Sequence, residues 1–183
     1  MLFLEDNNSF SFSATPLKSI KELEEGLWLL LIGINDVPPH IALAYEGKYY
    51  SLTARKLDNG SPLVRLIDTL QRKKIPTLFV HIETNNNILS FLENLYKDLP
   101  PLGNTDKTCL SPIKELFATT YSEEFSKSNY IFELLALAQT KGLLKECLSV
   151  FCAPNDVTLP KYTMAQIKNR IQELSQPKAL QNH

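Results

Sequence analysis

The chain has 183 residues, of which 44% are hydrophobic and 21% charged, and both values are typical of a soluble globular protein. Nineteen Lys and Arg residues face 20 Asp and Glu residues, so the formal net charge is −1. This balance excludes a strong electrostatic attraction to nucleic acid or to an anionic membrane, and we expect no nucleic acid as a partner. The longest apolar run, at 27–34, is far shorter than the ~20 residues that cross a bilayer, so no transmembrane segment is predicted.

The first residues, MLFLEDNNSF, contain two early acids and no basic region or cleavage site, so we see no secretory signal and expect a cytoplasmic protein. Three cysteines are an odd and low number, which argues against a disulfide framework. CxxC, HExxH, GxGxxG and GxxxxGK[ST] motifs are all missing from the sequence. We therefore predict no metal and no cofactor.

Hydrophobic periodicity and turn residues divide the first half of the chain into short helices and strands. An extended lead-in is predicted at 1–15 and a capped helix from Thr15-Pro16 to about 25. The continuous apolar run at 27–34 is typical of a strand covered on both faces. The remaining predicted elements are strands at 41–45 and 48–53 joined by a hairpin, a loop at 57–62, a helix at 63–74 and a strand at 75–82.

The second half of the chain is predicted to be helical. Apolar residues at helical spacing indicate helices at 88–99, from 109 to about 117, at 130–137 and at 164–174, with 147–151 as a further helical stretch and 176–183 as a loose tail. A strand meander followed by helices is the pattern of an α+β fold with an antiparallel sheet. The length fits a single domain spanning 1–183.

Cys109 is the one cysteine at the predicted start of a helix. Thr108 or Ser111 can cap this helix, and Pro112 lies in its first turn, where a missing N–H is tolerated. Backbone N–H groups at a helix start favour a thiolate, which is the nucleophilic form of cysteine.

His40 is a candidate base for this thiol, because it opens the strand at 41–45. Strand alternation puts three side chains on one face: His40, Ala42 and Ala44. A face of small residues lets a helix approach closely, and if that helix begins at Cys109, thiol and imidazole meet at the sheet edge. On the neighbouring strand Tyr49, Ser51 and Thr53 share a face, and Ser51 is best placed to accept a hydrogen bond from the imidazole.

Each of these residues also has a simple structural interpretation. A cysteine on an apolar helix face is usually a buried small hydrophobe, and a lone histidine on a strand is usually structural. His81 lies inside an apolar strand and is the second candidate base. Cys147 and Cys152 are interpreted as core residues.

The segment GLWLLLIGINDVPPHIALAYEGKYYSLTA at 26–54 resembles the opening of a circularly permuted NlpC-type, papain-like cysteine hydrolase. In that family an apolar strand and a loop precede a strand led by the catalytic His, followed by a hairpin turn. The later segment ILSFLENLYKDLPPLGNTDKTCLSPIKELF resembles the helix, loop and nucleophile helix of the same family, in the permuted order with His before Cys. The resemblance covers about 20–120 and implies a papain-like core there, with a C-terminal helical extension at 125–176.

Residue by residue, the resemblance makes Cys109 the nucleophile, His40 the general base and Ser51 the third polar residue. Three features depart from the family pattern. Ser51 replaces the usual His, Glu, Asn or Gln, and Leu99 lies where a tyrosine often precedes the cysteine. The loop before Cys109 also lacks the Asn that permuted relatives often carry. The implied function is a hydrolase or acyltransferase that cleaves an amide or ester bond in a peptide, cell-wall or lipid substrate. Two alternatives stay open: a catalytically degenerate binding or interaction protein on the same fold, and an unrelated α+β domain.

Overall fold

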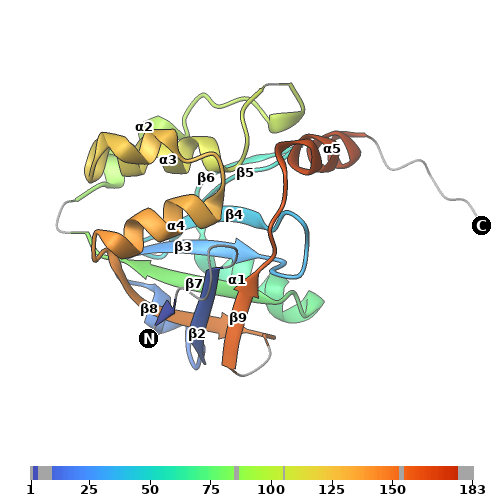
Figure 1. Cartoon of the computed structure of the whole chain (residues 1–183). Helices are drawn as coiled ribbons and strands as arrows, with labels where there is room; N and C mark the ends of the chain where they lie inside the picture. The colour runs from blue at the N-terminus through green and yellow to red at the C-terminus, as the bar shows by residue number, and fades with distance from the viewer. Residues whose placement is uncertain (1, 4–9, 85–86, 105, 153–154, 177–183) are drawn as a thin grey trace, which may run out of the picture.

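The computed structural model describes residues 2–3, 10–84, 87–104, 106–152 and 155–176. Within them the chain forms a mixed α+β fold around a mostly antiparallel sheet, with the strand order β1-β2-β8-β7-β3-β4-β5-β6 and β9 paired with β2 (Figure 1). The strands are β1 (Leu2–Phe3), β2 (Phe10–Pro16), β3 (Leu27–Ile32), β4 (His40–Tyr45), β5 (Lys48–Leu52), β6 (Leu57–Pro62), β7 (Thr77–Ile82), β8 (Leu144–Val150) and β9 (Asn155–Leu159). The helices are α1 (Leu63–Lys73), α2 (Leu89–Leu95), α3 (Leu110–Thr120), α4 (Ile131–Thr140) and α5 (Met164–Ser175), with 3₁₀ turns η2 (Ile20–Leu23), η3 (Leu102–Asn104) and η4 (Glu123–Lys127).

Strand β3 lies in the central part of the sheet, and both of its faces are apolar. It pairs antiparallel with β4 on one side and with β7 on the other. Leu27, Leu29 and Leu31 face one core cluster, whereas Trp28 and Leu30 face the other. The continuous apolar run in the sequence therefore corresponds to a strand that is covered on both faces, as predicted.

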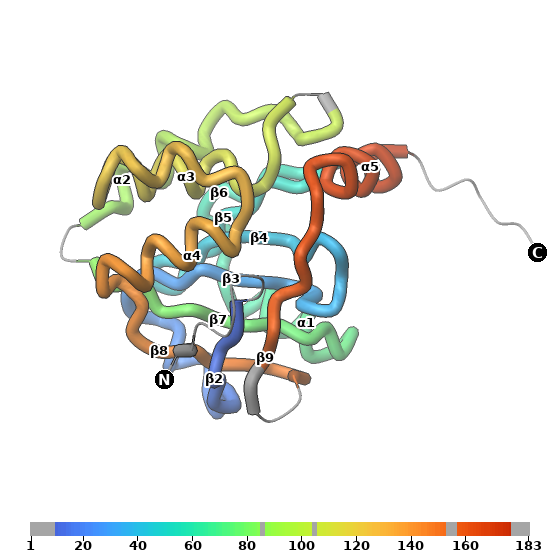
Figure 2. Tube along the Cα trace, in the orientation of Figure 1, coloured from blue at the N-terminus to red at the C-terminus, as the bar shows by residue number. Residues whose placement is uncertain are grey.

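Helices cover both faces of this sheet. The larger core cluster contains the apolar sides of α2, α3 and α4 together with Ile167 of α5. The smaller cluster on the opposite face contains Leu63, Ile67 and Leu70 of α1, packed on Ala42 and other strand residues. The arrangement of these layers along the chain can be followed in Figure 2. Every described helix is too short, or too polar, to cross a membrane.

The predicted lead-in at 1–15 is extended where the structure describes it, and it includes strand β2, whose Phe10 and Phe12 are buried in the core. One prediction for the N-terminal region is wrong. The helix expected from Thr15-Pro16 is only the 3₁₀ turn Ile20–Leu23, because the end of β2 up to Pro16 pairs in parallel with β8. The turn begins at Ser19, whose hydroxyl accepts from the Lys21 backbone N–H at 3.3 Å.

Two more segments fold as strands where none was predicted. The expected loop at 57–62 is β6, which pairs with β5 across an irregularity at Tyr49/Tyr50, and Gly60 supplies a positive φ of 74° within it. The stretch at 147–151 lies at the end of β8 instead of in a helix, and Cys147 and Leu148 face opposite core clusters. The C-terminal segment at 125–176 is therefore not only helical, since β8 pairs with β7 in the central sheet.

The other predicted elements agree with the structure to within a few residues. The strands at 27–34, 41–45, 48–53 and 75–82 correspond to β3, β4, β5 and β7, and the five predicted helices after residue 62 correspond to α1 to α5. Among the described residues the α+β class and the mainly antiparallel sheet are confirmed.

Candidate active site

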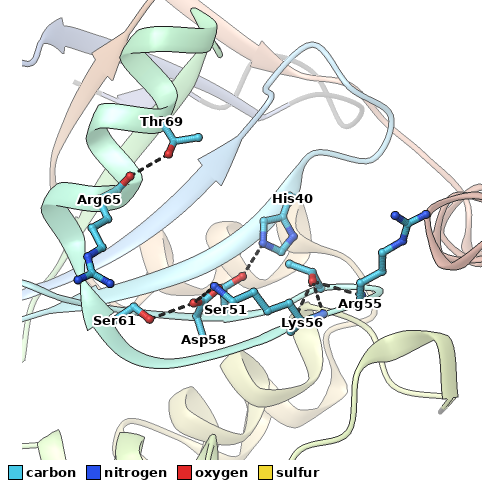
Figure 3. A network of polar contacts seen from close by, with 9 residues as sticks. His40, Ser51, Arg55, Lys56, Asp58, Ser61, Arg65 and Thr69 are labelled. Carbon is cyan, nitrogen blue, oxygen red and sulfur yellow. Dashed lines mark hydrogen bonds and ion pairs between the residues drawn. The ribbon is translucent and has the colours of Figure 1, made fainter. Parts of the chain in front are cut away.

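His40 and Ser51 are in direct contact on neighbouring strands. The Nε2 atom of His40 lies 2.8 Å from the Ser51 hydroxyl, and Figure 3 shows the imidazole directed toward that side chain. The contact follows from the β4–β5 hairpin, whose register pairs Leu43 with Tyr50 and Ala44 with Tyr49. This register puts positions 40 and 51 diagonally across the same face of the sheet. The structure thus brings together two of the three residues in the predicted site.

The polar surroundings of this contact extend onto β6. Asp58 pairs with Ser51 across the β5–β6 ladder, and its carboxylate accepts from Lys56 Nζ at 2.6 Å and from the Ser61 hydroxyl at 3.0 Å (Figure 3). The Tyr49 side chain lies on the same face of β5 and interacts with Ser51. The result is a buried polar cluster on an otherwise apolar sheet face, in which each group has a partner.

Burial lowers the pKa of His40 to about 4, and the opposing effect of the Asp58 carboxylate is smaller. The imidazole is therefore neutral at pH 7 and can accept a proton. The same burial raises the pKa of Tyr49 to about 12, so its hydroxyl stays protonated and serves as a neutral hydrogen-bonding group.

Cys109 lies immediately before α3 and is half-buried. Burial raises the pKa of its thiol, whereas the nearby backbone N–H groups of Ile41, Cys109 and Leu110 lower it by less. The start of the helix is fixed by Ser111, whose hydroxyl accepts from the Thr108 backbone N–H at 2.9 Å. The sulfur thus lies among backbone donors of the kind that stabilise negative charge, within a site that otherwise favours the neutral thiol.

The effect of the Ile41 backbone N–H on the thiol pKa indicates that the sulfur lies near this part of β4, directly after His40. Pairing between β4 and β5 ends at Leu43–Tyr50, so Ile41 lies beyond the paired part of these strands. The segment leading to Cys109 is held at the same place by hydrogen bonds from Leu102 N to Thr53 O at 3.0 Å and from Gly103 N to Ala54 O at 3.3 Å. The His40 backbone and the segment that leads to Cys109 therefore lie at the same end of β4.

The thiol and the imidazole approach this end from different faces of the sheet. The expectation that the Cys109 helix covers the face of Ala42 and Ala44 is wrong, because α1 packs there, while α3 packs on the opposite face with Ile41 and Leu43. Among the described residues no hydrogen bond joins the Cys109 sulfur to the His40 ring.

Two tyrosines near the thiol were missed by sequence reasoning. Tyr96, at the end of α2, is fully buried and interacts electrostatically with Cys109, and burial raises its pKa. Tyr96 lies one helical turn before Leu99, the position at which a tyrosine was expected. The helical periodicity of this segment could therefore have identified Tyr96 from the sequence. Tyr162 is buried and also interacts electrostatically with Cys109, and burial raises its pKa. Nothing near Tyr162 in the sequence indicates that it approaches residue 109.

The other candidate residues lie elsewhere in the sheet. His81, on β7, stacks on Trp28 with ring centroids 4.5 Å apart, and β3 separates it from β4. Cys147 is buried in β8, and Cys152 contacts the Thr77 carbonyl oxygen at 3.6 Å. These contacts support packing roles for all three side chains.

Across the described ranges, no group of three or more His, Cys, Asp or Glu side chains is arranged to hold a metal ion. No protein-family model, curated protein or solved structure matches the chain.

Proposed function

We propose that the chain is a cysteine hydrolase or acyltransferase with a permuted papain-like fold, in which Cys109 is the nucleophile and His40 the general base. The observation that supports this proposal is that the segment leading to Cys109 is hydrogen-bonded to Thr53 and Ala54, at the end of the β4–β5 hairpin where His40 lies. The far nitrogen of the imidazole is at the same time fixed by Ser51 at 2.8 Å. A thiol, a base and a group that orients the base are the parts that nucleophilic catalysis requires.

The chemistry begins from a neutral pair, because burial lowers the pKa of His40 and raises that of Cys109. With Nε2–H donating to Ser51, the Nδ1 lone pair accepts the thiol proton while the sulfur bonds to an amide or ester carbonyl carbon. The Cys109 backbone N–H stabilises the oxyanion. The imidazolium then protonates the leaving nitrogen or oxygen as its bond to carbon breaks. Water or another acceptor attacks the thioester with His40 as base, which restores the thiol.

Proton transfer requires the sulfur and Nδ1 to come within about 3.5 Å of each other. The two side chains leave the end of β4 toward different faces of the sheet, so the start of α3 has to move around this end for the sulfur to reach Nδ1 while His40 keeps its hydrogen bond to Ser51. We propose that substrate binding at the end of β4 brings about this movement, since catalytic contacts commonly tighten only in the substrate complex.

The second candidate is a binding or interaction protein on the same fold. It is favoured by the raised pKa of the Cys109 thiol and by the different sheet faces of the two side chains. In this case the His40–Ser51 contact is a structural element of the buried polar cluster. Substrate identity and a cytoplasmic location stay predictions from the sequence.

Alkylation by iodoacetamide at pH 7.5, followed by peptide mapping, separates the two candidates. A hydrolase site predicts that Cys109 reacts about tenfold faster than Cys147 and Cys152, and that His40→Gln removes this advantage. His81→Gln is the matched control, because it replaces a histidine on a neighbouring part of the sheet and should leave the rate at Cys109 unchanged. Equal, slow labelling of the three thiols, or no effect of His40→Gln, supports the binding protein instead.

A further inference from the structure

A polar groove of about 410 Å³ lies between α5 and the loop that joins β3 to β4. The loop contributes Asn35 and Asp36, and α5 contributes Asn169, Arg170 and Glu173. Arg170 spans the groove, with nitrogens 4.0 Å from the Asp36 carboxylate and 3.5 Å from the Glu173 carboxylate. Both ion pairs are long for charged hydrogen bonds and are exposed, so a ligand can compete for these groups at a small cost.

Both walls of the groove belong to segments that connect to the candidate active site. Its loop wall leads through two prolines into His40. Its helical wall, α5, packs on η3, which precedes Cys109 by a few residues, and Ser175 of α5 lies directly against Gly103. Figure 1 shows α5 beside the β3–β4 loop.

The position of α5 is fixed from the same side of the molecule. Arg55, in the segment after β5, donates from Nε to the Leu174 carbonyl oxygen at 2.5 Å and from its terminal nitrogen to the Gln176 carbonyl oxygen. Figure 3 shows the Arg55 side chain extended toward this helix. The groove is therefore bounded on one side by a helix that is tied to the β5–β6 connection.

The lining chemistry favours a peptide over an acyl chain. The side-chain amides of Asn35 and Asn169 form no hydrogen bond with any other described residue, so they can pair with peptide N–H and C=O groups. An acyl chain would instead remove water from these amides and from the charged groups without replacing their hydrogen bonds. The one apolar side chain in the lining is Val37, which is 41% exposed.

The charge of the groove favours a basic ligand. Asp36 and Glu173 oppose the single Arg170, which leaves a formal charge of −1 on the lining. We propose that this groove binds the substrate beside the candidate catalytic residues, and that the substrate is a peptide carrying a lysine or a free amino group. This inference rests on the proposed function only in calling the ligand a substrate. Binding of the peptide itself does not require Cys109 to react.

Binding is measured on the full chain by fluorescence anisotropy with three dye-labelled probes: Ala-Lys-Ala, Ala-Glu-Ala and dodecanoate. We expect Ala-Lys-Ala to bind most tightly. Asn169→Leu and Glu173→Gln should each weaken its binding by about threefold, the range of exposed charged and polar contacts, and added salt should reduce the preference. Lys168→Gln is the matched control, since it removes a charge from α5 outside the groove and should leave binding unchanged.

The proposal is overturned if dodecanoate binds more tightly than Ala-Lys-Ala. It is equally overturned if the groove variants behave like Lys168→Gln, or if Ala-Lys-Ala shows no saturable binding up to about 1 mM. The iodoacetamide experiment reports separately on the thiol. Expected anisotropy results together with an unreactive Cys109 would keep the peptide groove and reject the hydrolase, whereas the reverse pair of results would reject the groove alone.

Discussion

Replacing His40 by Gln should remove a component of the pH dependence of folding stability. Burial lowers the pKa of His40 from 6.5 to about 4, a difference of about 2.5 units. Each unit corresponds to 1.36 kcal/mol of differential proton binding, so this one side chain should account for about 3 kcal/mol between the two pH limits. Gln is the matched replacement, because its side-chain amide nitrogen can still donate to the Ser51 hydroxyl.

The direction of the effect follows from which state binds the proton. Above pH 6.5 the histidine is neutral in both folded and unfolded chains, and its contribution is fully present. Between pH 6.5 and pH 4 the unfolded chain takes up a proton that the folded chain excludes, so the free energy of unfolding falls. Below pH 4 both states are protonated, and the loss is complete.

Urea denaturation of the wild type and of His40→Gln at pH values from 4 to 8 measures this component. Carboxylates titrate in the same range, but they are common to both chains and cancel in the difference. The free energy of unfolding of the wild type relative to the variant should fall by about 3 kcal/mol from pH 7 to pH 4. A constant difference, or a His40 resonance that titrates near pH 6.5 in the folded protein, would refute the inference that burial keeps this imidazole neutral.

Two further predictions concern the neighbours of this site. Asp58→Asn should lower the pKa of His40 further, because the Asp58 carboxylate is the group that raises it, and an NMR titration of the imidazole measures the shift. Gly103→Ala should cost about 1–3 kcal/mol in urea denaturation, since the new Cβ would lie 2.5 Å from the Ser175 hydroxyl oxygen and 3.2 Å from the Ala54 carbonyl oxygen. Adding Ser175→Ala should recover part of this loss, and an unchanged stability of the single variant would show that α5 is not seated firmly on η3.

Local patterns in the sequence were sufficient to predict the central strands and the His40–Ser51 contact. A hairpin fixes register over a few residues, so once Glu46-Gly47 was identified as the turn, alternation alone placed positions 40 and 51 on one face. The same reasoning was insufficient for β6 and β8. The sequence of β6, LDNGSP, consists mostly of turn-forming residues, and it becomes a strand only because β5 offers it an edge to pair with.

The face of the sheet on which a helix packs is a property that no local pattern contains. Both α1 and α3 have an apolar side, and β4 presents apolar side chains in both directions. The small residues Ala42 and Ala44 suit close packing by either helix, and α1 occupies them because it follows directly after β6 in the chain. The short connection thus decided which helix covers this face, and α3 was left to cover the other.

A hydroxyl at position 51 has a chemical consequence for any reaction at this site. A carboxylate in contact with the imidazole would stabilise an imidazolium and raise its pKa, whereas the Ser51 hydroxyl adds no charge. The nearest negative charge is that of Asp58, which is itself held by Lys56 at 2.6 Å and raises the pKa of His40 by less than burial lowers it. A Cys109–His40 pair would therefore work from its neutral form and would retain its base down to about pH 4, so the acid limb of thiol alkylation should lie well below the ordinary histidine range.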